Sequence, residues 1–434
     1  MEDDPLFRRT RQHAELRLSF HSGQSDKERI KQIKEFLRLE REMLLRYHQK
    51  GDSGLRLTRS RAVILDVLIQ NLFDYAIKVA KESMGKVKPM CVLATGGYGR
   101  GELSPHSDID LMFLYPRTSI GKSLDILKKT MTREILYPLW DTGLKVGHAS
   151  REVKEALVES QKDIRNKNSM LDGRFLCGDR KIAQKFIEKF HKFCRRNNPS
   201  EYLKELLLHQ QKRRLEKGST VFLQAPDVKN GVGGLRDFQG ILWMTKVKFD
   251  KHGLDGLVNK KYLTEQEANS LEEAYSFLLR VRNELHFRSK RPVDILHLEK
   301  QPEVALGLGY QEEDIFRRVE LFMGDYYSKA RTINQLSGIL EQRLVYASSG
   351  STSSISFKNV IKAYQSPPAQ EVDGFDLNGQ QLSTQNPQLF DEDPERLIRL
   401  FRHSQRLSAR LSPDLRSLVR NRLSLIDSNL INSQ

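Results

Sequence analysis

Residues 91–115 read CVLATGGYGRGELSPHSDIDLMFLY, and the interpretation of the whole chain starts from this stretch. A short apolar run that ends abruptly at Gly96-Gly97 is typical of a buried strand followed by a glycine turn. Eleven residues after Gly97, an Asp-Ile-Asp triplet at residues 108–110 opens a second apolar run. Because side chains alternate along a strand, the two carboxylates are predicted to share one face while the isoleucine enters the core.

Asp108 and Asp110 are the candidate metal ligands. Two carboxylates at this spacing repel each other unless a cation neutralises them. A hard divalent cation such as Mg²⁺ prefers carboxylate oxygens and could also hold a triphosphate. Gly96 and Gly97 would leave backbone N–H groups open to a phosphate. The pattern therefore predicts a phosphate-handling metal site at the end of a small sheet.

A Gly-Gly turn followed by an acidic-apolar-acidic strand resembles the signature of the DNA-polymerase-β-like nucleotidyltransferase superfamily. The fuller string over residues 96–114, GGYGRGELSPHSDIDLMFL, resembles the PII-uridylyltransferase family of nitrogen regulation. The resemblance covers about residues 26–428, the transferase half of that family. It implies transfer of UMP from UTP to a tyrosine hydroxyl of a PII-type signalling protein, with Mg²⁺ as cofactor and with Ser107 supporting the phosphates.

Members of the superfamily generally use a third carboxylate as a base or a further metal ligand. The candidates here are Asp141, Asp163 and Asp172. The resemblance favours Asp172, because it stands where the family carries an acidic residue, and implies that it activates the acceptor hydroxyl as a general base. His148, on a strand predicted over residues 143–149, could also reach the active centre, although a lone histidine on a strand more often has a structural role.

A second glycine-rich segment, PDVKNGVGGLRDFQ at residues 226–239, leads into a predicted helix. The family has a near-identical Lys-x-Gly-x-Gly-Gly-Leu-Arg-Asp segment. A glycine loop at a helix N-terminus suits an anion, and Lys229 could reach one. The alternative is a tight interdomain turn in which Arg236 and Asp237 pair to lock two domains together. Both interpretations are kept. The basic run Lys212-Arg213-Arg214 could line a phosphate path or be a solvated helix face.

The composition favours an anionic partner. The 434 residues include 72 Lys and Arg against 56 Asp and Glu, a formal net charge of +16. This charge suits a nucleoside triphosphate. It is spread along predicted helices without a basic tail, which argues against nucleic acid. The N-terminus lacks the apolar core of a signal peptide, and no run of about 18 apolar residues could span a membrane. We therefore expect a cytoplasmic protein, and the three cysteines to be reduced thiols.

The predicted fold class is α+β: a small mixed-sheet nucleotidyltransferase domain packed with a helical-bundle domain. We predict N-terminal helices in residues 1–80, although residues 1 to about 25 show no firm period. The nucleotidyltransferase domain follows at 81–180, and a helical domain that forms the substrate and nucleotide cleft at 181–346. Residues 347–434 are predicted to contain a flexible linker, a small hairpin and C-terminal helices.

The sequence thus predicts a metal-dependent, uridylyltransferase-like nucleotidyltransferase. No paired His-Asp string of a hydrolase is present, so no domain for the reverse reaction is expected. One alternative keeps the chemistry and changes the acceptor to RNA or a small molecule. The other is a catalytically weak regulatory or binding module of the same fold, against which the intact Asp108 and Asp110 argue.

Overall fold

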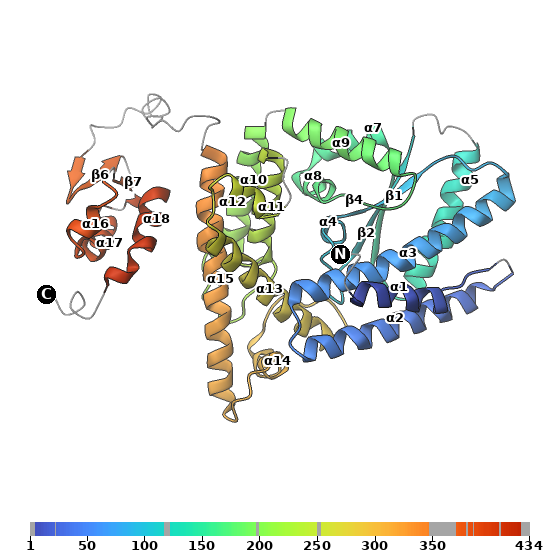
Figure 1. Cartoon of the computed structure of the whole chain (residues 1–434), viewed down its shortest axis with the longest axis horizontal. Coiled ribbons are helices and arrows are strands. Elements are labelled where there is room, and N and C mark those ends of the chain that lie inside the picture. Colours follow the sequence, from blue (N-terminus) through green and yellow to red (C-terminus); the bar gives the residue numbers. More distant parts are fainter. Residues whose placement is uncertain are drawn as a thin grey trace. The chain divides into compact units, whose positions relative to one another are not determined.

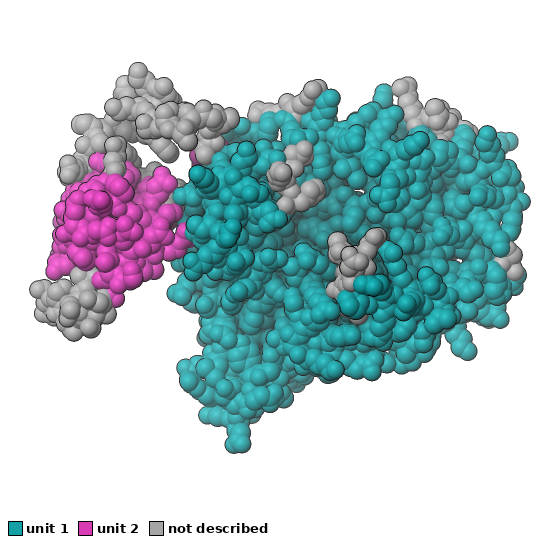
Figure 2. Space-filling view, in the orientation of Figure 1, with its two compact units in different colours: residues 1–344 teal, residues 345–434 magenta. Residues whose placement is uncertain are grey.

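The computed structural model describes nine stretches of the chain: residues 5–21, 23–116, 122–196, 199–249, 253–346, 370–378, 381–384, 386–407 and 409–426. The chain divides into two compact units, residues 1–344 and 345–434 (Figure 2), and each has a hydrophobic core of its own. Both units combine helices with a four-stranded sheet. The predicted α+β class is therefore confirmed, while the finer division of residues 1–346 into three parts stays a prediction.

The first half of unit 1 holds its sheet and the helices around it (Figure 1). In chain order these are α1 (Pro5–Arg17), α2 (Asp26–Gln49), α3 (Gly54–Met84), β1 (Cys91–Thr95), α4 (Gly96–Gly99), β2 (Ile109–Tyr115), α5 (Lys122–Met131), a π-helical turn (Thr132–Leu136), α6 (Tyr137–Asp141), β3 (Val146–Glu152), α7 (Val153–Lys162), α8 (Ile164–Leu171) and β4 (Arg174–Gly178).

The sheet of unit 1 is mixed, with the strand order β3-β2-β1-β4. Strand β1 is antiparallel to β2 and β4, whereas β2 and β3 are parallel. The strand predicted over residues 143–149 exists but is shifted, because β3 begins only at Val146 and continues to Glu152. The order puts the glycine turn and the acidic strand on the two central strands of the sheet.

One hydrophobic core joins the N-terminal helices to the sheet. It contains Ala14 and Leu18 from the N-terminal segment, Phe36 of α2 and alternate residues of β2 such as Leu111. The first residues, for which no firm period was expected, therefore form α1 and pack on this core. Helix α9 (Arg180–Arg196) contacts β1, β2 and β4.

The remaining helices of unit 1 are α10 (Pro199–Glu216), α11 (Leu235–Phe249), α12 (Asp255–Asn259), α13 (Glu265–Phe287), a 3-10 turn (Leu298–Lys300), α14 (Gln301–Leu308) and α15 (Ile315–Tyr346). Helix α13 contacts α3, α11 and α14, so it ties the helices around the sheet to the helical part (Figure 1). None of the helices in the described ranges is both long and apolar enough to cross a membrane. The three cysteines are buried and free, as expected.

Unit 2 contains β5 (Gln370–Val372), β6 (Phe375–Asn378), β7 (Gln381–Ser383), α16 (Leu389–Glu392), α17 (Arg396–Arg406), β8 (Arg410–Leu411), α18 (Pro413–Asn421) and a 3-10 turn (Leu423–Leu425). Strands β6 and β7 pair antiparallel with Asn378 opposite Gln381, which confirms the predicted hairpin. The two residues between them and the predicted linker lie outside the described residues.

Candidate active site

The pairing of β1 with β2 brings the first glycine turn next to the acidic strand. Thr95 pairs with Asp110, and Gly96 follows at the same end of β1. Gly96 has a φ of +57°, and a Cβ there would lie 3.1 Å from Asp110 Oδ2 and 3.3 Å from the Ser169 hydroxyl. The backbone angle therefore favours glycine, and a Cβ would also crowd the Asp110 and Ser169 side chains. Gly97 follows in the same turn, where its carbonyl accepts a hydrogen bond from Glu102 N at 2.9 Å.

The side chain of Asp110 lies against a second glycine, Gly147. In the parallel pair of β2 and β3 its partner is Gly147, where a Cβ would lie 2.8 Å from Asp110 Oδ1. Asp108, just before β2, is exposed, whereas Asp110 is half-buried. Burial raises the pKa of Asp110, and the like charge of Asp108 raises it further. The two carboxylates therefore concentrate negative charge at the end of the sheet.

Two cations face this carboxylate pair from the second glycine-rich segment. Lys229 and Arg236 both lower the pKa of Asp110, against the effect of its burial. Lys229 also lies 3.8 Å from Asp294, and its own pKa is lowered by burial and by Arg282. The segment thus brings positive charge close to Asp110 at the end of the sheet.

The backbone of this segment is not an anion cradle, because the loop uses its N–H groups itself. Asp227 Oδ1 accepts from the N–H groups of Lys229 and Asn230, at 3.1 and 2.8 Å, and Asp237 Oδ2 accepts from Gly233 N at 2.7 Å. Hydrogen bonds to carbonyls of the same loop take up the N–H groups of residues 231, 234, 235 and 236. The loop therefore offers side chains, rather than backbone, to an anion.

The predicted ion pair between Arg236 and Asp237 is wrong. Asp237 is fully buried and instead accepts hydrogen bonds from Arg213 and Arg214 of α10. Arg214 also forms two hydrogen bonds of 2.7 Å with Glu341 of α15. Two members of the basic run on α10 are therefore structural, and they are neither a phosphate path nor a solvated face.

Arg236 is the site residue that sequence reasoning missed. Its Nη1 donates to Gln239 Oε1 at 3.0 Å, and its guanidinium lies 5.7 Å from the ring centre of Trp243. No carboxylate of the described residues lies within ion-pair distance of it. Burial and the neighbouring Arg100 lower the pKa of Arg236 to about 10, so it stays charged at neutral pH. The sequence signal for Arg236 was its position seven residues after Lys229, at the other end of the same glycine-rich segment.

Asp172 lies at the C-terminal end of α8, just before β4, and its carboxylate already has two partners. Arg100 Nη1 lies 2.5 Å from Oδ2, and Trp243 Nε1 donates to the same carboxylate at 3.0 Å. Burial raises the pKa of Asp172, while Arg100 opposes this effect. Among the described residues, no group of three or more His, Cys, Asp or Glu side chains could hold a metal ion. Asp172 is therefore not assembled with the carboxylate pair into a three-acid group.

Ser107 connects the acidic strand to the helical part. Its Oγ accepts from Ser104 N at 3.1 Å and lies 3.3 Å from Arg282 Nη1 of α13. Arg282 also donates to Asp294 at 2.7 Å. Arg282 of α13 thus pairs with Asp294 and also reaches Ser107, so Ser107 is part of the ion-pair network that begins on this helix.

His148 does not reach the carboxylate pair. It aligns with Leu111 of β2, whose side chain lies in the core, and not with Asp110 on the opposite face. Its ring lies 5.7 Å from the ring of Trp140. The structural alternative for His148 fits this position. Of the other carboxylate candidates, Asp163 caps α8 by accepting from Arg165 N at 2.8 Å, and Asp141 ends α6 on the surface.

Comparison with known proteins gives two kinds of match. A family model described as GlnD PII-uridylyltransferase matches residues 201–341. The curated relatives include bifunctional uridylyltransferase/uridylyl-removing enzymes from three bacteria. The one from Bradyrhizobium diazoefficiens is 32% identical over 388 residues, which are 88% of this chain and 41% of the relative. The one from Azospirillum brasilense is 30% identical over 393 residues, 90% of this chain and 41% of the relative.

The enzyme from Nitrobacter winogradskyi is 33% identical over 349 residues, which are 79% of this chain and 36% of the relative. The chain thus spans about two-fifths of the length of the curated relatives that it matches. The second glycine-rich segment lies within the residues that the family model matches, whereas the first glycine turn and the carboxylate pair precede them.

Proposed function

Because this chain belongs to the PII-uridylyltransferase family, we propose that it transfers a nucleotidyl group, UMP from UTP, to a tyrosine hydroxyl of a PII-type protein. The observation that carries the proposal is the meeting of three features at one end of the sheet: the Gly96 turn, the carboxylates of Asp108 and Asp110, and the cations of Lys229 and Arg236. A triphosphate needs all three, since its negative charge must be neutralised on several sides.

The donor set suits Mg²⁺. Asp108 and Asp110 supply only oxygen, the donor that Mg²⁺ prefers, and a divalent cation between them would relieve the repulsion that adds to the effect of burial on the pKa of Asp110. These two residues would hold the ion. When bound, Mg²⁺ would neutralise the pair, bridge the triphosphate and stabilise the charge on the departing pyrophosphate.

The chain's own groups would bind and orient the nucleotide. The first N–H groups of the helical turn that begins at Gly96 and Gly97 have no partner within that turn, so they can donate to a phosphate. Lys229 and Arg236 would take the charge of the outer phosphates. Asp172 is proposed as a third functional carboxylate that positions the glycine turn and does not bind the metal with the carboxylate pair: it holds the Arg100 guanidinium, and the backbone N–H of Arg100 donates to the Gly96 carbonyl at 3.1 Å.

The test is to incubate the chain with Mg²⁺, each labelled nucleoside triphosphate in turn and a PII-type protein, and to measure the intact mass of the acceptor. We expect the mass to rise by one uridylyl group with UTP, and the product to disappear with Asp110→Asn. The matched control is Asp141→Asn, an exposed acid on the same domain, which should retain transfer.

The other outcomes separate the alternatives. Binding of a triphosphate without an adduct on the PII-type protein would point to an RNA or small-molecule acceptor. An absence of triphosphate binding in the wild-type chain would contradict the proposal and favour a regulatory or binding module. Unchanged transfer by Asp110→Asn would remove the carboxylate pair from the mechanism.

A further inference from the structure

A row of hydrogen bonds joins the first glycine turn to Arg236, and we call it the Glu102–Arg236 network. At the turn, the backbone N–H of Glu102 donates to the Gly97 carbonyl at 2.9 Å. The hydroxyl of Tyr275 on α13 donates to Glu102 Oε2 at 2.7 Å. Gln239 Nε2 on α11 donates to the Tyr275 hydroxyl at 3.0 Å, and Gln239 Oε1 accepts from Arg236 Nη1 at 3.0 Å. Two groups that would bind the same triphosphate are therefore connected through side chains.

The direction of each bond in the network follows from the charge of Glu102. This carboxylate pairs with Arg100 at 2.9 Å, and an ionised carboxylate can only accept hydrogen bonds. Tyr275 must therefore give it its single O–H, and burial raises the pKa of Tyr275 so that the proton stays in place. The Tyr275 oxygen is then left as an acceptor for the N–H₂ group of Gln239. The amide of Gln239 thus turns its oxygen towards Arg236.

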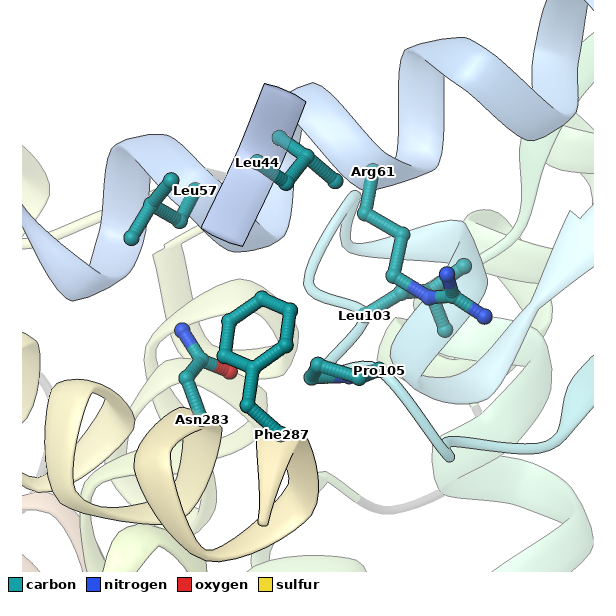
Figure 3. Close-up of a pocket in the computed structure, with 7 residues that line it drawn as sticks. All are labelled: Leu44, Leu57, Arg61, Leu103, Pro105, Asn283 and Phe287. Atoms are coloured by element: carbon teal, nitrogen blue, oxygen red, sulfur yellow. The ribbon is translucent and has the colours of Figure 1, made fainter. Parts of the chain in front are cut away.

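Packing fixes the middle of the network. Tyr275 is 1% exposed, and its ring stacks on Phe238 with 3.9 Å between the ring centres. The loop that follows Glu102 also packs on α13. There, Pro105 and Phe287 line a cavity of only about 10 Å³, which has room for about one water molecule (Figure 3). The loop and the helix therefore keep the Tyr275 hydroxyl next to Glu102.

Gln239 holds Arg236 without neutralising it. Among the described residues, it supplies the one side-chain oxygen to which Arg236 donates, and an amide oxygen carries no net charge. Arg213 shows the structural alternative: it also donates to a glutamine, Gln210 Oε1 at 2.7 Å, but Asp237 supplies its counter-charge. The guanidinium of Arg236 is thus fixed in place while its charge remains available to an anion.

We propose that Gln239 and Tyr275 are positioning residues, which hold the charged Arg236 where it can bind the outer phosphates of a nucleoside triphosphate. This inference rests on the proposed function and adds to it two residues that act through Arg236. Because Glu102 also closes the first glycine turn, the network sets the position of Arg236 relative to that turn. The two groups would then approach one triphosphate with a fixed separation, which lowers the cost of ordering them on binding.

The experiment is titration calorimetry of the full chain with UTP in the presence of Mg²⁺, together with the melting temperature of each variant. Gln239→Met keeps the length of the side chain and removes both hydrogen bonds. We expect it to weaken UTP binding about tenfold, the effect of one hydrogen bond to a charged group. Gln239→Glu should weaken binding at least as much, because its carboxylate would pair with Arg236 and cancel the charge.

Tyr275→Phe tests the network one bond further from Arg236. It removes only the hydroxyl and keeps the ring that stacks on Phe238. The amide of Gln239 can then turn its N–H₂ group towards Arg236, so we expect UTP binding about threefold weaker. The matched control is Tyr310→Phe, because the Tyr310 hydroxyl also donates to a carboxylate, Asp325 at 2.6 Å, outside the network. The control should leave UTP binding unchanged.

A double-variant cycle separates positioning from a merely structural role. In a chain that already carries Arg236→Gln, neither Gln239→Met nor Tyr275→Phe should weaken UTP binding further, because no guanidinium is left to position. A structural role would lower the melting temperature and would cost the same in both backgrounds. If Gln239→Met does not fold, Tyr275→Phe carries the same cycle.

The outcomes distinguish this inference from the proposed function. If the wild-type chain binds UTP and the Gln239 and Tyr275 variants bind it equally well, or if their losses add fully to that of Arg236→Gln, the positioning role is wrong and the nucleotide site stands. No binding of UTP by the wild-type chain would overturn both. The expected shifts in affinity without transfer to a PII-type protein would support the positioning role and contradict the proposed acceptor.

Discussion

Two groups of acids in unit 1 show how differently the same chain treats negative charge. Asp237, fully buried between α10 and α15, has fixed partners in Arg213 and Arg214, and Glu341 shares Arg214. Asp110 at the end of the sheet is only half-buried, and no cation of the described residues lies within ion-pair distance of it. The first group has its counter-charge built into the fold. The second leaves a place for one.

The pKa shifts distinguish the two groups further. Burial raises the pKa of Glu341, but the positive charge of Arg214 opposes this effect. Burial also raises the pKa of Asp110, where Asp108 adds to the increase, and the cations that oppose it, Lys229 and Arg236, form no ion pair with Asp110 among the described residues. Neutralising Asp110 would remove its repulsion with Asp108, whereas neutralising Asp237 would remove its ion pairs with Arg213 and Arg214. This difference is the one expected between a structural ion-pair network and the metal site proposed at Asp108 and Asp110.

The strongest test of the difference between the two groups is to neutralise one acid in each and to measure the free energy of unfolding. Asp237→Asn leaves Arg213 and Arg214 without their shared partner, so we expect the free energy of unfolding to fall by about 3–5 kcal/mol. Asp110→Asn removes a repulsion and should change stability by less than about 1 kcal/mol, in either direction. Urea unfolding followed by circular dichroism measures both. Equal losses in the two variants would mean that Asp110 is also a structural acid.

Contacts between residues that are close together in the sequence could be predicted, whereas contacts between distant segments could not. The glycine turn and the Asp-Ile-Asp strand lie within residues 91–115, and their patterns predicted both strands and their mutual approach. Asp237 finds its arginines about 24 residues earlier on another helix, and nothing in the local pattern specifies that contact. Arg236 was therefore assigned a partner that it does not have, because its immediate neighbour was acidic.

The same reasoning explains the N-terminal segment and β3. Helix α1 and the residue after it bury Ala14 and Leu18 in a strongly basic stretch, so the apolar period of this segment is weak although both side chains lie in the core. The start of β3 depends on its register with β2, where Ile109 pairs with Val146. This register cannot be read from the sequence of β3 alone. The local sequence predicted the strands and glycine turns of the site. Contacts between distant segments determine which of its charged side chains are already engaged in ion pairs.

A pH titration tests the network beside the site. His286 of α13 is fully buried, 3.3 Å from Asp294, and burial lowers its pKa to about 4 although Asp294 opposes the effect; Arg282 and His106 also face it. The folded pKa is below the unfolded value of about 6.5, so this contribution to stability is present above pH 6.5 and is lost as the pH falls towards 4. The loss amounts to about 3 kcal/mol.

Urea unfolding at several pH values between 7 and 4.5 measures this effect. We expect His286→Gln to flatten the dependence in that window, while His21→Gln, at an exposed position, should leave it as in the wild-type chain. An identical slope in the wild type and the His286 variant would show that the histidine does not titrate with unfolding.

Arg236 and Arg214 allow the comparison to be repeated with cations. If Arg236 binds phosphate, Arg236→Gln should lower kcat/KM for the triphosphate about 10²-fold, or about 2.7 kcal/mol, with little change in stability. Arg236→Lys should recover part of the loss, because the charge remains and the planar fork is gone. Arg214→Gln should do the reverse and lower stability first. Steady-state transfer rates and melting temperatures of the three variants decide between these expectations.

The smallest change tests whether Asp110 works from the position seen here. A methyl group at Gly147 would lie 2.8 Å from Asp110 Oδ1, so Gly147→Ala must push the carboxylate aside. We expect transfer to fall about tenfold, or about 1.4 kcal/mol. Stability should stay equal or rise by about 0.5 kcal/mol, because alanine loses less backbone freedom than glycine in a strand.

His148→Ala is the matched control, since it changes the next residue on the opposite face and should leave transfer intact. Activity and stability would then move in opposite directions at a single position. The fold requires only that β2 and β3 pair, whereas transfer also requires the Asp110 carboxylate at one position. Gly147→Ala changes the second without the first. If Gly147→Ala transferred at the wild-type rate, the productive position of Asp110 would have to differ from the one that β2 and β3 give it.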